Sequence, residues 1–400
     1  MRSRFTHIFV AAVCPLVFCA SLFAQTPAGN SIEVVYNQYG SIVQTYNIDR
    51  QTGFPAQQGQ GVTLDFTSGP ATIVPSQNDH FLYVTAFANN QQYLWVYATD
   101  STGVPQLPAV QTLILLGNGF SPLSIDPDGT VAYATRITQN TENQQVFALI
   151  YSFGINPTTG KVKEGTKVAT YPANGPCSSG ADYASFILVG FNPSGTKMYD
   201  SWYCPYFYGE QGFYYSRPVN QKTGALGSET QIAYWSNGET TSTNLVNITP
   251  SSILYFDVPI QNSYGQSELG VASPSGTPLF NCTATMLEAC GYATWETPDP
   301  SGRYVFFQVS PDNTLIAKIE LAQQKVVETG NYVNGFVVGF SPDDVLVYTQ
   351  DQQVLNPSTY SIYVFDPATG CIRSWPSQSR SGSKSHLTLN LTTGYSPASG

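Results

Sequence analysis

The chain has 400 residues, of which 42% are hydrophobic and 13% are aromatic, enough to build a sizeable core. Only 10% of the residues are charged, less than half of the usual quarter, and the formal net charge is −10. The aromatic content excludes a disordered protein, and the acidic balance argues against nucleic acid or an anionic membrane surface as a partner.

The N-terminus carries the pattern of a secretory signal peptide over residues 1–24. The basic start "MRSR" is followed by the apolar run "IFVAAVCPLVFCASLF" and then by the small residue Ala24. This order predicts cleavage near Ala24 and an extracytoplasmic location, either periplasmic or secreted. A lipid anchor on Cys19 is the alternative reading, although Phe18 stands where a small residue is expected. No later segment is apolar enough to predict a membrane span.

Two kinds of turn punctuate the rest of the chain. A turn with a proline between two strand-like runs, as in "IDPDGTVAY" (residues 125–133), occurs six times, at Pro75, Pro127, Pro193, Pro250, Pro300 and Pro342. A second turn, often Thr-Gly, ends at Gly53, Gly103, Gly160, Gly224, Gly276 and Gly370, and residues 319–325 occupy a seventh such place without a glycine. Proline and glycine supply the backbone angles that tight turns need.

Each unit therefore reads as strand A, Pro turn, strand B, variable loop, strand C, Thr-Gly turn and strand D. Repeats of this kind predict an all-β fold, a β-propeller of four-stranded antiparallel blades. Seven C–D turns against six A–B turns predict seven blades, with residues 386–391 closing the ring as strand A of the first blade. We expect the propeller over residues 31–392 and a C-terminal tail over residues 393–400.

One segment is ambiguous between helix and strand. Residues 314–330, "TLIAKIELAQQKVVETG", could form a helix by composition. Their alternation of apolar and polar residues and their place in the repeat favour two strands.

The repeats resemble a known family. The unit "FLYVTAFANNQQYLWVYATDSTG" (residues 81–103) resembles the YVTN-type repeat of bacterial propellers, and "IYVFDPATG" looks like the same turn in seven-bladed lactonase-like propellers. The resemblance implies sugar-lactone hydrolysis or cycloisomerisation, with His, Glu or Arg side chains at the central mouth. This sequence departs from that pattern, because His80 lies in a Pro turn and His386 opens the closing strand.

The strand order separates short turns from long connections. The A–B and C–D turns share one rim of the propeller, and the B–C and D–A connections share the other, which we call the long-loop rim. Functional residues tend to lie on loops that a rigid scaffold holds, so we expect them on the long-loop rim.

The richest segment of that rim is "DSWYCPYFYGEQGFYYSRP" (residues 200–218), which we expect to be an aromatic loop. The candidate ligand-binding residues on the whole rim are Trp202, Tyr206, Tyr208, Trp235, Trp295 and Asp182. Aromatic side chains there could stack on sugar rings or bury against a partner, although packing between blades is the alternative for each of them. The acids on or near the rim are Asp182, Glu239, Glu288 and Glu296, and any two that face each other could do acid–base work. No catalytic residue is assigned.

Five cysteines remain after the signal peptide, as expected for an oxidising compartment. Their places in the repeat predict the pairs Cys177–Cys204 and Cys282–Cys290 on the long-loop rim, with Cys371 free on the opposite rim. No zinc-type Cys or His spacing occurs, and the Asp126 and Asp128 pair reads as a turn rather than a calcium loop. We therefore expect neither a metal nor a cofactor.

Three functions stay open. The first is a monomeric, exported module that binds a glycan or a protein through the long-loop rim, which the aromatic content favours. The second is a lactonase-type hydrolase or cycloisomerase with an acid-based site at the central mouth. The third is a structural envelope protein without a small ligand.

Overall fold

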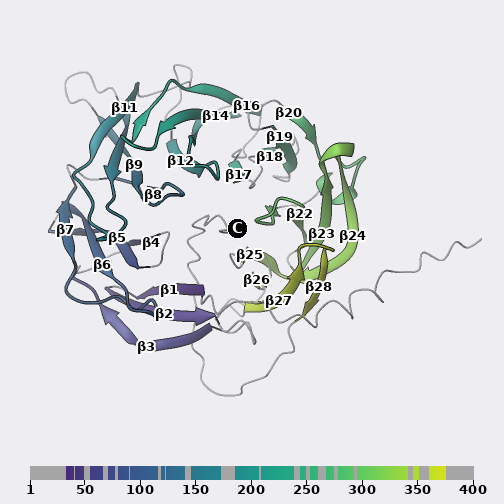
Figure 1. The fold of residues 1–400 in the computed structure, drawn as a ribbon. Coiled ribbons are helices and arrows are strands. Elements are labelled where there is room, and N and C mark those ends of the chain that lie inside the picture. Colours follow the sequence, from purple (N-terminus) through teal and green to yellow (C-terminus); the bar gives the residue numbers. More distant parts are fainter. Residues whose placement is uncertain are drawn as a thin grey trace, which may run out of the picture.

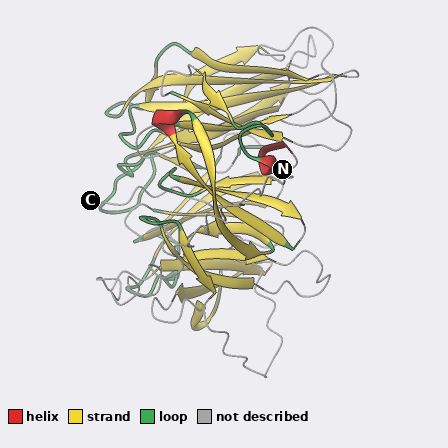
Figure 2. Cartoon of the chain, turned by 90° about the vertical axis from the view of Figure 1, so that its right-hand side faces the viewer, coloured by secondary structure: helices red, strands yellow, loops and turns green. Residues whose placement is uncertain are grey.

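The computed structural model describes residues 33–39, 41–48, 55–65, 71–76, 80–89, 91–115, 119–121, 123–139, 146–172, 185–206, 209–237, 244–248, 253–259, 267–273, 278–291, 295–310, 312–340, 346–350 and 360–374. These residues form seven antiparallel sheets around a central axis, which we number blades 1 to 7 in chain order (Figure 1). Seen from the side, strands make up nearly all of the described chain, with two short helical turns (Figure 2). The all-β propeller fold is as predicted.

The first four blades are built as follows. Blade 1 contains β1 (Glu33–Tyr39), β2 (Ile42–Ile48) and β3 (Pro55–Thr63), and blade 2 contains β4 (Thr72–Pro75), β5 (Phe81–Ala88), β6 (Gln91–Ala98) and β7 (Gln111–Ile114). Blade 3 contains β8 (Ser124–Ile125), β9 (Val131–Gln139), β10 (Val146–Gly154) and β11 (Thr166–Pro172). Blade 4 contains β12 (Ser185–Phe191), β13 (Lys197–Tyr206), β14 (Gly209–Asn220), β15 (Ala225–Leu226) and β16 (Thr230–Asn237).

The remaining blades follow the same order. Blade 5 contains β17 (Asn244–Ile248), β18 (Leu254–Pro259), β19 (Ser267–Ala272) and β20 (Pro278–Asn281), and the 3-10 turn η1 (Glu288–Gly291) follows it. Blade 6 contains β21 (Trp295–Pro298), β22 (Tyr304–Ser310), β23 (Asn313–Glu320) and β24 (Lys325–Asn334), with the 3-10 turn η2 (Leu321–Gln323) between the last two. Blade 7 contains β25 (Phe336–Phe340), β26 (Leu346–Gln350), β27 (Tyr360–Asp366) and β28 (Cys371–Ser374).

Two predictions from the repeat can be compared with these strands. The ambiguous segment 314–330 forms strands β23 and β24, so the reading as two strands is confirmed. Blade 1 has three described strands and begins at strand B, as the count of turns predicted. The proposed closing strand, residues 386–391, lies outside the described residues, so closure of the ring stays a prediction.

A polar side chain fixes the turn between strands A and B in three blades. Asp126 Oδ1 accepts hydrogen bonds from the backbone N–H groups of Thr130 and Val131, both at 2.8 Å. Asn192 Oδ1 accepts one from Lys197 at 2.8 Å, and Asp299 Oδ1 accepts one from Tyr304 at 2.7 Å. These are Asx-type turns, in which the side chain satisfies backbone donors where the ladder stops. The Asp126 turn is thus structural, and among the described residues no His, Cys, Asp and Glu cluster could hold a metal ion.

An aromatic residue occupies the same register position of strand B in blades 2 to 7. These six side chains are at most 2% exposed: Tyr83, Tyr133, Tyr199, Tyr255, Phe306 and Tyr348. Two of them tie one blade to the next, since the Tyr133 hydroxyl donates to Gly224 O at 3.0 Å and the Tyr255 hydroxyl donates to Gly302 O at 2.7 Å. The repeated aromatic residue is therefore the core packing element between blades.

Two glutamine amides lock blade 2 to blade 3. Gln92 Nε2 donates to Phe120 O at 3.0 Å while its Oε1 accepts from Phe120 N at 2.8 Å. Gln111 Nε2 donates to Val162 O at 2.8 Å while its Oε1 accepts from Val162 N at 2.7 Å. Each glutamine side chain bonds the N–H and C=O groups of one residue, as a neighbouring strand would do. The buried or half-buried backbone groups of Phe120 and Val162 are satisfied in this way. The abundance of amide residues in this weakly charged chain thus has a structural use.

Candidate functional site

The inner end of the long-loop rim is formed by the beginnings of the A strands. Strands β4, β12, β17 and β25 lie close to the axis (Figure 1), and each runs from the long-loop rim towards the short-turn rim. We call their first residues, together with that of β21, the mouth: Thr72, Ser185, Asn244, Trp295 and Phe336. The mouth is thus a set of aromatic, hydroxyl and amide residues, and none of the five is ionisable.

A ring of polar residues lies next to the mouth on strand B. Two residues beyond each repeated aromatic, towards the long-loop rim, the chain carries Thr85, Thr135, Ser201, Asp257, Gln308 and Gln350. All but Thr135 share a cross-strand row with the inner strand, as Thr85 does with Thr72 and Gln308 does with Trp295. Thr85, Thr135 and Gln308 are buried. Five of the six residues carry hydroxyl or amide groups, which both donate and accept hydrogen bonds, and Asp257 adds a carboxylate that accepts them, so this ring suits a ligand rich in hydroxyl groups.

One acid stands in an innermost strand. Glu296, the second residue of β21, is 3% exposed, and it is the only ionisable residue of the described innermost strands. Its cross-strand partner is Phe307, a core residue. A buried carboxyl group beside the mouth is a candidate acid or base, and the sequence had included Glu296 among its acids.

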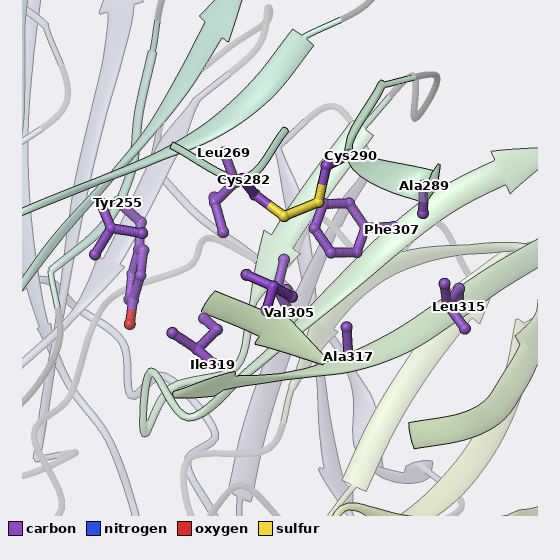
Figure 3. Close-up of a cluster of buried hydrophobic side chains, with 12 residues drawn as sticks. Tyr255, Leu269, Cys282, Ala289, Cys290, Val305, Phe307, Leu315, Ala317 and Ile319 are labelled. Atoms are coloured by element: carbon purple, nitrogen blue, oxygen red, sulfur yellow. A yellow bond between two sulfur atoms is a disulfide. The ribbon is translucent and has the colours of Figure 1, made fainter. Parts of the chain in front are cut away.

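The D–A connection before β21 is held by a disulfide. Cys282 and Cys290 are bonded, with their Cα atoms 5.6 Å apart, and both are fully buried. Figure 3 shows this bridge above Val305 and Phe307, within the cluster between blades 5 and 6. This predicted pair is confirmed. It anchors the connection that leads to Trp295, so the bridge positions one side of the mouth.

The aromatic segment of blade 4 is a β-hairpin rather than the predicted loop. Strands β13 and β14 pair up to Tyr206 and Gly209, and β16 follows β14 to Asn237. Register decides the outcome for Trp202, which is 2% exposed and meets the ring of Tyr171 in blade 3 edge-on, with centroids 5.9 Å apart. Trp202 therefore packs between blades, and its proposed role in ligand binding is wrong.

The other aromatic candidates are placed by their backbone. Tyr206 ends β13, Trp235 lies near the end of β16 and Trp295 begins β21, so all three lie towards the long-loop rim. Asp182, Tyr208 and Glu239 lie outside the described residues. Glu288 is exposed in η1, and the structure brings no two of the four candidate acids together among the described residues.

Of the other two cysteine predictions, one is not tested by the described residues and one is wrong. Cys177 lies outside the described residues, so the Cys177–Cys204 pair stays a prediction. Cys371 is disulfide-bonded, so the expectation of a free thiol is wrong. The residue begins β28 directly after the C–D turn, so its rim was assigned correctly.

The sequence did not single out a charged network in the seam between blades 3 and 4. Arg217 Nε donates to Asp200 Oδ2 at 2.5 Å, its Nη2 donates to Glu229, and its guanidinium lies 4.4 Å from the ring centre of Tyr171. Asp200 is 0% exposed, and its Oδ1 has no hydrogen-bond partner in the described part of the chain. Alternation in β13 and β14 would have placed Asp200 and Arg217 on one face, but only the three-dimensional seam shows Tyr171 opposite them.

Burial and charge have opposite effects on the pKa values of this network, and the balance differs between Asp200 and Arg217. Desolvation raises the pKa of Asp200 to about 6, although the charge and the hydrogen bond of Arg217 oppose that rise. Burial lowers the pKa of Arg217, but the charge and hydrogen bond of Asp200 outweigh it and raise that pKa overall. Asp200 and Arg217 bond to each other, and Arg217 lies against Tyr171 of the neighbouring blade, so the network joins two blades.

Comparison with known proteins gives a fold and no family. No protein-family model matches the sequence, and no curated protein matches it. A candidate 6-phosphogluconolactonase from Bacteroides fragilis NCTC 9343 is similar in structure, with a TM-score of 0.55 and 14% identity over 88% of this chain and 95% of that chain.

A second candidate 6-phosphogluconolactonase, from Bacteroides uniformis ATCC 8492, has a TM-score of 0.53 and 13% identity over 86% of this chain and 94% of that chain. Identity this low shows the fold alone. The chain has the fold of a lactonase-like β-propeller.

Proposed function

We propose that this protein is an exported propeller of YVTN type that binds a glycan at the mouth of its long-loop rim. The observation that carries the proposal is the ring beside Trp295, in which five residues carry hydroxyl or amide groups and Asp257 is the single carboxylate. Sugars are recognised by groups that both donate and accept hydrogen bonds and by aromatic faces. The mouth supplies both, and it supplies little charge for a phosphorylated or strongly acidic ligand.

The first experiment measures binding of neutral oligosaccharides to the mature protein. Isothermal titration with cellohexaose, chitohexaose and maltohexaose is expected to show saturable binding of at least one of them. Trp295→Ala is expected to weaken that binding by tenfold or more, about 1.4 kcal/mol. Tyr332→Ala is the matched control, because Tyr332 is half exposed on the outer strand β24 and far from the mouth.

Two outcomes would contradict the glycan proposal. One is the absence of binding by all three sugars at millimolar concentration. The other is an equal loss of affinity in the Trp295→Ala and Tyr332→Ala variants. A protein ligand or a purely structural role in the envelope would then be the better reading. N-terminal sequencing of the protein made in its host tests export separately, with Gln25 as the expected first residue.

A lactone hydrolase is the second candidate. Glu296 favours it, because a buried carboxyl group on an innermost strand could activate a water molecule that attacks the lactone carbonyl. The structural similarity to candidate 6-phosphogluconolactonases agrees with it only at the level of fold. A pH-stat assay with gluconolactone and 6-phosphogluconolactone is the test. Turnover above the spontaneous rate that Glu296→Gln abolishes, with the fold intact by circular dichroism, would favour the enzyme over the binding module.

A further inference from the structure

A small apolar pocket lies where blade 2 meets blade 3, and none of its lining residues belongs to the mouth or to the polar ring. Its volume is about 80 Å³, and it is lined by Leu113, Ile114, Leu115, Phe120, Tyr151, Phe153, Glu164 and Gly165. The ring of Phe120 meets those of Tyr151 and Phe153 edge-on, with centroids 5.1 and 6.3 Å apart, and forms an aromatic floor. We call this feature the blade 2/3 pocket.

The edge of the blade 2/3 pocket is exposed and hydrophobic. Ile114, the last residue of the outer strand β7, is 53% exposed while it lines the pocket. A β-branched aliphatic side chain at the free edge of a sheet costs solubility unless something covers it. The pocket is about the size of three water molecules, which is room for one aliphatic side chain of the size of leucine.

Lysines cluster beside this pocket. The chain has only 16 Lys and Arg residues in 400, yet three of them, Lys161, Lys163 and Lys167, fall within seven positions and are exposed. With Glu164 as the single acid of the segment, the local charge is positive on a protein that is acidic as a whole.

Specific contacts hold the lysine segment against the pocket. The two hydrogen bonds between Gln111 and Val162 attach it to β7, next to Leu113 and Ile114. Lys163 N donates to Gly154 O at 2.8 Å, beside Phe153. Lys167 lies directly opposite Tyr151 in the pairing of β10 with β11. The cations therefore stand around the pocket because of the fold and not only because of sequence proximity.

We propose that the blade 2/3 pocket is a docking site for a protein partner that inserts one aliphatic side chain flanked by acidic residues. The pocket takes the aliphatic group, and the lysines attract the flanking carboxylates. A site this small buries far less than a standard interface, so the contact is weak and transient when used alone. Its electrostatic part raises the association rate and is screened by salt. This site is separate from the mouth and does not rest on glycan binding.

The test uses a defined peptide and the full mature protein. The probe is a fluorescein-labelled undecapeptide with one leucine between runs of Asp and Glu. Fluorescence anisotropy is expected to show saturable binding that weakens as salt rises from about 50 to about 300 mM, a range over which the Debye length falls from about 14 Å to about 6 Å. Replacing the leucine of the probe by alanine, or its acids by lysines, is expected to reduce binding at least fivefold.

Matched variants of the protein locate the site. Ile114→Asp and Lys163→Glu are expected to weaken binding by tenfold or more. Val327→Asp and Lys222→Glu are the controls, because they introduce the same changes at exposed positions of blades 6 and 4, and they should change affinity less than twofold. Both test positions lie on the surface, so the variants should keep the fold, which circular dichroism checks.

Several results would overturn the proposal. No binding of the acidic probe up to 1 mM, equal binding of the lysine probe, or equal losses in the control variants would each do so. Binding to phosphatidylglycerol vesicles that Lys163→Glu abolishes, without binding of the peptide, would assign the surface to a membrane. Self-association in sedimentation that Ile114→Asp abolishes would assign it to a second copy of this chain.

Discussion

The hydroxyl of Tyr133 in blade 3 donates a hydrogen bond of 3.0 Å to the carbonyl oxygen of Gly224 in the C–D turn of blade 4. Its counterpart in the next blade, Tyr199, is equally buried, but its hydroxyl has no hydrogen-bond partner among the described residues. A tyrosine at the same register position therefore forms an interblade hydrogen bond in blade 3 and only packs in blade 4. The pair offers a matched comparison of a satisfied and an unsatisfied buried hydroxyl.

Tyr133→Phe is expected to lower the free energy of unfolding by about 1 kcal/mol, because it leaves the Gly224 carbonyl unpaired in the seam. Tyr199→Phe is expected to be neutral or slightly stabilising, because it removes a buried polar atom that makes no bond. Urea denaturation of both variants measures the difference. Equal losses in the two would contradict the assignment of the interblade hydrogen bond.

Gln324 occupies the place that glycine fills in the other C–D turns. Its φ is +50°, against +68° at Gly160 and +69° at Gly224, so a residue with a Cβ is held in the left-handed region. Gln324→Gly is expected to stabilise the protein by about 1 kcal/mol, since the strain disappears and outweighs the added freedom of the unfolded chain. Gln323→Gly, one residue earlier, is the control and is expected to destabilise. A loss of stability in Gln324→Gly, measured by thermal unfolding, would contradict this account.

The raised pKa of Asp200 gives a pH dependence of stability. Burial holds this pKa at about 6, above the unfolded value near 3.9, so between these values unfolding releases a proton. The contribution of Asp200 to stability is therefore complete below pH 4 and is lost as the pH rises to about 6. The full change is about 3 kcal/mol at most, taken as two pH units at 1.36 kcal/mol each.

Asp200→Asn tests this assignment, because the amide does not titrate. Urea midpoints measured from pH 4 to pH 7 should fall with rising pH in the natural protein by an amount that the variant lacks. Parallel pH profiles in the two proteins would show that Asp200 titrates alike in the folded and unfolded states.

The bridge between Cys282 and Cys290 closes a short loop. With the two residues eight positions apart in sequence, the chain-entropy estimate is about 2.5 kcal/mol. The double variant Cys282→Ala and Cys290→Ala is expected to lose roughly that much, together with some packing against Phe307. Thermal unfolding with and without reductant is the measurement, and reductant should have less effect on the variant. If glycan binding falls while the fold persists, the bridge also positions the mouth.

The sequence predicted the repeat well because turns are local. Pro127 and Gly129, or Asp366 and Gly370, specify backbone angles and hydrogen bonds within a few residues. Counting such turns predicted that blade 1 lacks its own strand A. The place of residues 314–330 in the same repeat favoured two strands there, which the structure has as β23 and β24.

The site was harder to predict because register and neighbouring blades decide it. Trp202 looked like a rim residue, but β13 continues past it to Tyr206, and its face meets Tyr171 from another blade. The polar ring could have been found by aligning the residue two places after each repeated aromatic, since Thr85, Thr135 and Gln308 share that position.

The paired hydrogen bonds of the Gln92 and Gln111 side-chain amides affect how the stability of the propeller depends on salt. They hold blades 2 and 3 together through four hydrogen bonds that carry no net charge. Dissolved ions weaken attractions between charges and leave neutral amides almost untouched. High and low concentrations of salt should therefore leave this seam equally stable.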